Sequence, residues 1–167
     1  TLWHDNGQKD SEVTFKDGKK EGLNATWHDN GQKEAETTFK DGKKDGLATL
    51  WHDNGQKSVE ASFKDGKQEG LATLWDANGD VLREEHYKNG NLEGLATRWY
   101  DNGQEAHRGH YKDDKQEGPW TFWRKDRQKW TEGAYKAGEK AGLWILWDED
   151  GKEVSRKNYK DGEEVAE

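Results

Sequence analysis

The stretch GLATLWHDNGQKSVEASFKDG, residues 46–66, contains two runs in which apolar and polar residues alternate, each followed by a turn signal. Asn54-Gly55 follows the first run and Asp65-Gly66 follows the second. Asn-Gly and Asp-Gly supply the positive φ angles of a two-residue type I′ turn, and between such runs they are the strongest short signal for a β-hairpin. Gly recurs too often for a helix, and no run has a 3.6-residue period. The stretch therefore predicts strand, turn, strand, turn.

This unit recurs along the whole chain with a period of 24 residues. Each copy has one aromatic residue before each turn, in two series: Trp3, Trp27, Trp51, Trp75, Trp99, Trp123 and Trp147, then Phe15, Phe39, Phe63, Tyr87, Tyr111, Tyr135 and Tyr159. A fixed period of this length indicates a repeat architecture. We predict an all-β fold, an elongated single-layer antiparallel sheet of tandem 24-residue β-hairpin repeats that forms one domain over residues 1–167.

About seven units fill the chain, and the first is truncated. Because it begins inside the repeat, we expect the chain to be a fragment of a longer array or an engineered array. Residues 118–167 form divergent C-terminal units that hold five of the ten Trp residues. An open sheet has two unpaired edges, so we expect either a monomer or an end-to-end oligomer.

Two-residue loops at both turns fix the strand register. They place Leu50 opposite Val59, Trp51 opposite Ser58, Val59 opposite Ala72 and Ala61 opposite Gly70. A slip of one residue would exchange the two faces of a strand, so the later departures from the repeat provide a check on this register.

Two of these departures exchange a large residue for a small one. In the last units Trp120 and Trp144 replace Ala, and their diagonal neighbours become Gly109 and Gly133. We predict that each ring covers a strand glycine, a known way to stabilise glycine in a sheet.

A third departure alters a turn. Asp126-Arg127 replaces Asn-Gly, a poorer type I′ sequence, and the same hairpin gains Trp130. We predict that Trp130 lies directly opposite Trp123, where a cross-strand aromatic pair would offset the weaker turn.

Composition limits the fold and the partners. Only 29% of the residues are apolar and 37% are charged, but aromatic residues make up 11%, which opposes disorder. The net charge of −8 argues against nucleic acids and anionic membranes, and it favours a basic protein partner. No Cys is present, so thiolate metal sites and disulfides are excluded.

The sequence offers few groups for chemistry. His4, His28 and His52 are equivalent residues of successive repeats, so neighbours among them lie two strands apart, on the order of 9–10 Å. The ligands of one zinc ion lie about 2.1 Å from the ion, so these histidines cannot share one. His86 is part of a looser group in which His107 and His110 lie on opposite faces. We predict no metal site, no cofactor, no catalytic residue and no enzyme activity, since a thin sheet has no cleft in which to shift carboxylate pKa values.

The order of Gly, aromatic strand, NGQ turn, aromatic strand and KDGK turn resembles the MORN repeat. The unit GLATRWYDNGQEAHRGHYKDDKQEG, residues 94–118, is most similar to the bacterial variant of this repeat. The resemblance covers nearly the whole chain, with departures at Asp114, Pro119 and Arg127. It implies a rod built from hairpins and a non-catalytic role, because MORN arrays generally act as scaffolds for proteins or lipids. Proteins rich in the bacterial variant are often described as antitoxins or immunity proteins.

A single sheet cannot bury both faces, and exposed aromatic surface often marks a binding site. The Trp series can also serve packing alone, and atypical end units can be caps. If a partner site exists, we expect it in the later units, with these candidate protein-binding residues: Arg98, Trp99, Tyr100, Phe122, Trp123, Arg124, Trp130 and Trp147.

The leading hypothesis is an antitoxin or immunity protein that binds and neutralises a cognate toxin or secreted effector. One alternative is a membrane- or lipid-associated MORN scaffold, against which the net charge of −8 argues. Another is a glycan- or cell-wall-binding repeat module. The sequence leaves open the partner's identity, the face that binds, and the location in the bacterial periplasm or cytoplasm.

Overall fold

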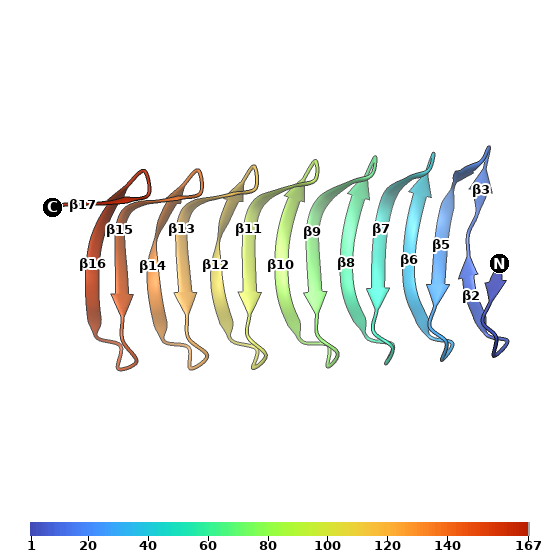
Figure 1. Cartoon of the computed structure of the whole chain (residues 1–167), viewed down its shortest axis with the longest axis horizontal. Coiled ribbons are helices and arrows are strands. Elements are labelled where there is room, and N and C mark those ends of the chain that lie inside the picture. The colour runs from blue at the N-terminus through green and yellow to red at the C-terminus, as the bar shows by residue number, and fades with distance from the viewer. Residues whose placement is uncertain (167) are drawn as a thin grey trace. The chain divides into compact units, whose positions relative to one another are not determined.

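The computed structural model describes residues 1–166, which form strands, turns and bends and no helix (Figure 1). These residues divide into two compact units. The first unit comprises Thr1–Val81 and Tyr87–Gly90, and the second comprises Leu82–His86 and the described residues from Asn91 onward. Strand β10 (Val81–Lys88) is therefore shared between them.

In the first unit, seven strands form an open antiparallel sheet: β1 (Leu2–Trp3), β2 (Lys9–Glu12), β5 (Gly22–Trp27), β6 (Lys33–Lys40), β7 (Lys43–Trp51), β8 (Lys57–Lys64) and β9 (Lys67–Trp75). A separate two-stranded sheet contains β3 (Phe15–Lys16) and β4 (Lys19–Lys20). Each strand of the larger sheet pairs with the next one in this order.

The second unit repeats the arrangement with β11 (Asn91–Trp99), β12 (Glu105–Lys112), β13 (Lys115–Trp123), β14 (Lys129–Lys136), β15 (Glu139–Trp147), β16 (Glu153–Lys160) and β17 (Glu163–Val165). These strands also pair in sequence order. The predicted all-β fold of tandem antiparallel hairpins in a single layer is confirmed.

The two turn types of each repeat differ in backbone geometry. At Asp41-Gly42 both residues have positive φ, 50° and 83°, as a type I′ turn requires. At Asn54-Gly55 only the glycine does, with φ 83°. There Gly55 N donates to His52 O at 2.9 Å, and His52 N donates to Gln56 O at 2.8 Å.

The Asn-Gly connection is therefore a three-residue loop with a glycine bulge, and the predicted two-residue turn was wrong there. The Asn54 side chain stabilises the longer loop, because its Oδ1 accepts the N–H of Gln56 at 3.0 Å. The longer loop also alters the pairing. Leu50 still lies opposite Val59, but Trp51 lies opposite Lys57 instead of Ser58.

The same loop geometry corrects the position of Trp130. Trp123 lies opposite Lys129, and Phe122 lies opposite Thr131, so Trp130 is the extra residue of a second bulge, separate from the one at Arg127. The predicted direct pair of Trp130 with Trp123 was wrong. Arg127, which replaces the turn glycine, has a φ of 76°.

A second irregularity lies near the other turn. Val59 pairs with Leu74 and Ala61 with Ala72, in place of the predicted partners Ala72 and Gly70. The register shifts between Ala61 and Phe63, opposite Gly70, which has a positive φ of 83°. A register counted outward from a two-residue turn assumes regular pairing and so misses this shift. Because the error is two residues, the faces of the strands are not exchanged, and Val59, Ala61, Ala72 and Leu74 share one face.

Side-chain hydrogen bonds join successive repeats at the three-residue loops. His28 Nε2 lies 3.2 Å from the carbonyl oxygen of Trp51, and His52 Nε2 lies 3.2 Å from that of Trp75. Since a carbonyl only accepts, each ring donates from Nε2. The Asn54 amide also donates to Ala77 O at 2.6 Å. The recurring His residues therefore have a structural partner in the next repeat.

Acidic side chains make a comparable link at the type I′ turns. Glu21 Oε2 accepts the N–H of Asp41 at 2.9 Å, and Glu93 Oε2 accepts that of Asp113 at 3.0 Å. The turn backbones also bond directly, as Gly42 N donates to Lys20 O at 2.9 Å. Both rows of turns are thus tied from repeat to repeat.

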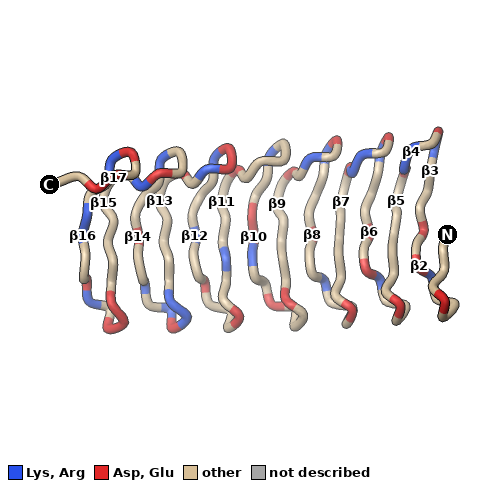
Figure 2. Tube along the Cα trace, viewed as in Figure 1, with Lys and Arg blue, Asp and Glu red and all other residues tan. Residues whose placement is uncertain are grey.

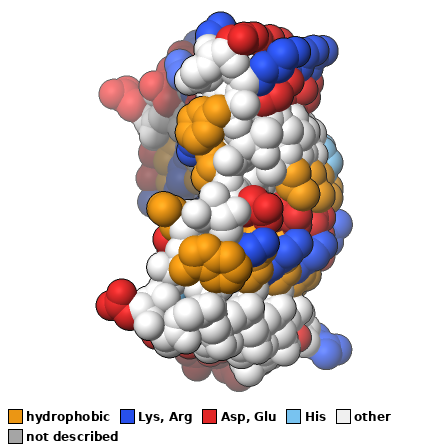
Figure 3. All heavy atoms as spheres, turned by 90° about the vertical axis from the view of Figure 1, so that its right-hand side faces the viewer, with side chains coloured by type: hydrophobic (Ala, Val, Ile, Leu, Met, Phe, Trp, Pro, Cys, Tyr) orange, Lys and Arg blue, Asp and Glu red, His pale blue; other side chains and the backbone are white. Residues whose placement is uncertain are grey.

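Cationic side chains cover the Trp series. Lys33 Nζ lies 5.7 Å from the centroid of the Trp51 ring, one repeat later, and Lys129 Nζ lies 5.8 Å from that of Trp147. Such cation–π contacts contribute roughly 0.5–1 kcal/mol each at exposed sites. Figure 3 shows apolar side chains at the surface beside Lys and Arg side chains. In the first unit Trp3 is 63% exposed.

The predicted exchange of large and small residues is confirmed. Trp120 is 1% exposed and lies directly opposite Gly109, where we had expected a diagonal contact. A Cβ added at Gly109 would lie 2.1 Å from the Trp120 ring, and one at Gly133 would lie 2.2 Å from the Trp144 ring. Only glycine fits beneath these rings.

We expect Gly109→Ala to lower the free energy of unfolding by about 1–3 kcal/mol, the usual cost of overpacking. In a Trp120→Ala background the same substitution should cost much less, because two alanines then face each other as Ala61 and Ala72 do. Urea unfolding of the four chains measures this coupling as a double-mutant cycle. Equal costs in both backgrounds would contradict the assigned contact.

Candidate functional site

Six of the eight candidate residues line one hollow of about 440 Å³ in the second unit: Arg98, Trp99, Tyr100, Phe122, Trp123 and Trp130. We call it the Arg98 hollow. Its other lining residues are Leu82, Asp101, Ala106, His107 and Lys125. Arg124 and Trp147 do not line it.

The floor of the Arg98 hollow is a row of side chains across neighbouring strands. Arg98 on β11 pairs with His107 on β12, which pairs with Phe122 on β13. Directly paired residues project from the same face of a sheet. The His107 and Phe122 ring centroids are 5.7 Å apart. The row therefore has a cation at one end and an aromatic ring at the other.

Buried aromatic residues hold Phe122 in place. The Trp120 ring stacks against Phe122 with centroids 5.9 Å apart and planes at 27°. Trp120 Nε1 donates to His110 O at 3.1 Å. The rings of Tyr111 and Tyr135 meet Trp120 edge-on at 5.2 and 6.0 Å, and burial raises the pKa of both phenols. This cluster gives the hollow a preorganised apolar side.

Trp130 forms the exposed wall of the hollow. It is 47% exposed, although Trp has the largest side chain of the apolar residues. At the same position of earlier repeats the chain has Asp10, Glu34, Ser58, Leu82 and Ala106. The bulge does not require a Trp, because these residues occupy the position equally well.

The rim contains an exposed ion pair and a structural tyrosine. Lys125 Nζ lies 2.8 Å from Asp101 Oδ1, and this hydrogen bond lowers the pKa of the Asp101 carboxyl. Lys125 also lies over the Tyr100 ring, 5.7 Å from its centroid. The Tyr100 hydroxyl donates to Trp123 O at 2.8 Å, the same link that His residues make in the first unit.

Arg124 makes this link in the following repeat. Its Nη2 donates to Trp147 O at 2.5 Å, and its Nε is buried without a hydrogen-bond partner among the described residues. Lys129 covers the Trp147 ring at 5.8 Å. These contacts place both residues in the connection between repeats and outside the hollow.

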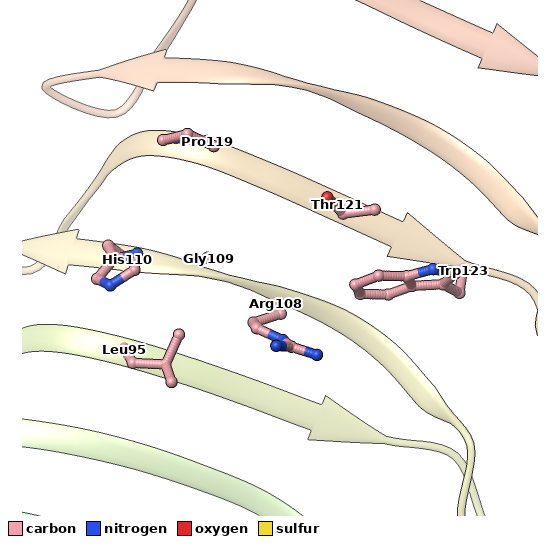
Figure 4. Close-up of a pocket in the computed structure, with 7 residues that line it drawn as sticks. All are labelled: Leu95, Arg108, Gly109, His110, Pro119, Thr121 and Trp123. Atoms are coloured by element: carbon pink, nitrogen blue, oxygen red, sulfur yellow. The ribbon is translucent and has the colours of Figure 1, made fainter.

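A second hollow, of about 350 Å³, lies over Gly109 and was not predicted (Figure 4). We call it the Gly109 hollow; it is lined by Leu95, Arg108, Gly109, His110, Pro119, Thr121 and Trp123. Arg108 follows His107 in β12, so its side chain points to the opposite face. Arg108 is already paired with Glu105 at 2.6 Å and lies 5.9 Å from the Trp123 ring centroid.

The sequence carried one signal for this second hollow. Leu95 is 37% exposed, and the same position is held by Leu23, Leu47 and Leu71, all of them exposed. A leucine that recurs once per repeat and stays exposed indicates apolar surface on this face. Pro119 takes this position in the next repeat, where the sequence departs from the repeat pattern.

Potential metal ligands do not gather in residues 1–166, where no group of three or more His, Cys, Asp and Glu side chains could hold an ion. His86 Nδ1 lies 2.9 Å from Leu95 O, a backbone partner. The described residues also include no helix long and apolar enough to cross a membrane.

Comparison with known families gives one clear match. A model described as "MORN repeat variant" matches residues 20–41, 44–65, 68–89 and 92–113, four segments of 22 residues that cover 88 of the 167. No curated protein matches the sequence. One similar solved structure, described as "Crystal Structure of TarM", is 14% identical with a TM-score of 0.38. That alignment covers 65% of this chain and 21% of the other, and it is too weak to bear on function.

Arg124→Leu should lower the free energy of unfolding by about 1 kcal/mol or more, because it removes a charge-assisted hydrogen bond to Trp147 O. Arg124→His should restore much of the loss, since His donates at this position in the first unit. Urea unfolding monitored by circular dichroism measures both. Equal stability of the Leu and His variants would contradict the link.

Acid should destabilise the floor of the Arg98 hollow through His107. Burial, and secondarily the positive charge of Arg98, lowers the pKa of His107, while Glu85 acts in the opposite direction. The unfolded chain therefore binds the proton more readily. The free energy of unfolding should fall as the pH drops from about 6.5 through the lowered value.

His107→Val, which introduces the residue found at Val59, should remove this part of the pH dependence. His110→Asn, on the opposite face, serves as the control and should keep it. Thermal unfolding at pH 7.5 and at pH 5 compares the three chains. Parallel losses in wild type and His107→Val would show that His107 is not the group responsible.

Proposed function

The chain belongs to the MORN repeat variant family, and from that premise we propose that it is a non-catalytic binding protein whose Arg98 hollow holds a partner protein. The partner we propose is a toxin or secreted effector that the chain neutralises by obstructing it. The toxin follows from the resemblance to bacterial MORN proteins, whereas the choice of surface rests on the residues of the hollow.

The observation that carries the proposal is that two residues depart from the repeat without serving the fold, and both line one hollow. Trp130 replaces Asp10, Glu34, Ser58, Leu82 and Ala106 of earlier repeats and stays 47% exposed. Arg98 replaces Thr26, Leu50 and Leu74 of earlier repeats and is also exposed. By contrast, Trp120 departs from the repeat and is explained by Gly109 beneath it.

The surroundings of these two residues suit binding. Exposed Trp and Arg side chains are enriched among the residues that contribute most to protein interfaces. Phe122 is held by its stack with Trp120, so little conformational entropy would be lost when a partner covers it. A catalytic role finds no comparable support, because the hollow combines one exposed ion pair with aromatic walls.

The test is complex formation with the proteins encoded beside this chain's gene, measured by calorimetry. Trp130→Ser, which introduces the residue of Ser58, should weaken binding by about 30-fold or more, as expected for a central Trp. Val154→Ser is the matched control, because Val154 has the same repeat position, is 54% exposed and lies outside the hollow. Its affinity should equal that of the wild type.

Two results would contradict the proposal. One is the absence of a complex with any neighbouring gene product, and the other is a complex that Trp130→Ser and Val154→Ser weaken equally. The membrane and glycan alternatives predict instead flotation with anionic liposomes, or a change in Trp fluorescence on adding choline or cell-wall glycans.

A further inference from the structure

We propose that the Arg98 hollow recognises an acidic segment of its partner, with a carboxylate at Arg98 and an apolar side chain between Phe122 and Trp130. This inference rests on the proposed function and specifies the chemistry of the partner. It reverses the sign of charge that the net value of −8 suggests for a partner.

Arg98 is the cation of the hollow that the chain leaves without an acidic partner. Within residues 1–166 its side chain makes no ion pair or hydrogen bond, whereas Lys125 is paired with Asp101 at 2.8 Å. Arg108 on the other face is paired with Glu105 at 2.6 Å. Arg98 is also the single Lys or Arg of β11 and gives that strand its blue stretch in Figure 2.

The repeat supplies a comparison for this residue. The position of Arg98 holds Leu50 and Leu74 in the first unit, and Phe122 and Leu146 later in the chain. An apolar residue is therefore sufficient for the sheet at this position. The guanidinium in its place offers up to five N–H donors in a planar fork, which suits a carboxylate bound through both oxygens.

The charge of the hollow stays at about one positive unit near neutral pH. Lys125 and Asp101 cancel, and Glu85, whose charge also acts on His107, is paired with Arg83 at 3.5 Å. Burial and the charge of Arg98 lower the pKa of His107 and keep its ring neutral. A carboxylate from a partner would thus meet one uncompensated cation. Local charge at the contact, and not the total charge of the chain, decides this complementarity.

The spacing of the row sets the form of the guest. Arg98 and Phe122 lie two strands apart with His107 between them, or about 9–10 Å. An extended segment advances about 3.3 Å per residue and its side chains alternate between two sides. A carboxylate and an apolar side chain two residues apart therefore point to the same side, about 7 Å apart at the backbone, and the length of the two side chains lets them reach both ends of the row. The apolar side chain would enter between Phe122 and the exposed ring of Trp130.

A protein segment fits these observations better than an anionic membrane. The hollow offers a single free cation, whereas membrane-binding surfaces gather several Lys and Arg residues. The net charge of −8 would also oppose approach to a negatively charged bilayer. A protein segment needs only one cation for its carboxylate and one apolar contact, and the hollow provides both at Arg98 and at Phe122 and Trp130.

The experiment is selection of random peptides displayed on phage against the full chain, followed by titration of synthetic copies. Wild type should enrich peptides with Asp or Glu two to four residues from an aromatic residue or Leu. Arg98→Glu, or replacement of the peptide's acid by its amide, should weaken binding by about tenfold or more. Lys112→Glu is the control, because it makes the same charge change at an exposed site of β12 outside the hollow.

Each result has a defined meaning. Peptides that require Trp130 but show no preference for acids would overturn this inference and leave the proposed function standing. Equal weakening by Arg98→Glu and Lys112→Glu would overturn it as a general charge effect. Binding of phosphatidylglycerol vesicles that depends on Arg98, without acidic peptides being selected, would overturn it in favour of a lipid surface. Failure of the proposed function itself is seen separately, as no complex with the neighbouring gene products.

Discussion

A sheet of one layer has no second layer to cover its faces, and most features of this chain answer that constraint. Each repeat instead covers the next one. Lys33 lies over the Trp51 ring of the following repeat, and His28 bonds to the carbonyl of the same Trp51. In the second unit Trp120 covers the backbone at Gly109. The apolar residues that remain uncovered are then the ones that a partner can reach.

The period of the sequence was sufficient to predict the hairpins, but not their loops. Asn-Gly suits both a two-residue type I′ turn and a three-residue loop that ends in a glycine of positive φ. The two are separated by a bond outside the dipeptide, from His52 N to Gln56 O. The choice decides the place of Trp130, which the longer loop puts at a bulge and not opposite Trp123. Local turn chemistry alone could not supply that information.

The candidate site was predicted in part for the same reason. Aromatic density pointed to Phe122 and Trp130, and both line the hollow. His107 was missed as a member of the site, because the row from Arg98 to Phe122 exists only once three strands are in register. Arg124 was predicted in the site because it lies among the Trp-rich later repeats, but its guanidinium bonds to the Trp147 carbonyl.

Internal repeats allow structural and functional departures to be told apart by their chemistry. At the first loop position the chain changes from His52 to Tyr100 to Arg124, yet each side chain donates a hydrogen bond to the Trp carbonyl of the next repeat. Asp76 and Asp148 hold the same position, and their carboxylates instead accept N–H groups of their own loops. Every side chain at this position therefore bonds to backbone, which is typical of a structural role. At Arg98 and Trp130 the chemistry itself changes. The residue opposite Arg98 is His107, where Val59 lies opposite Leu50, but no side chain in residues 1–166 pairs with the Arg98 guanidinium. A side chain that the fold neither requires nor compensates is the kind that binding to another molecule would explain.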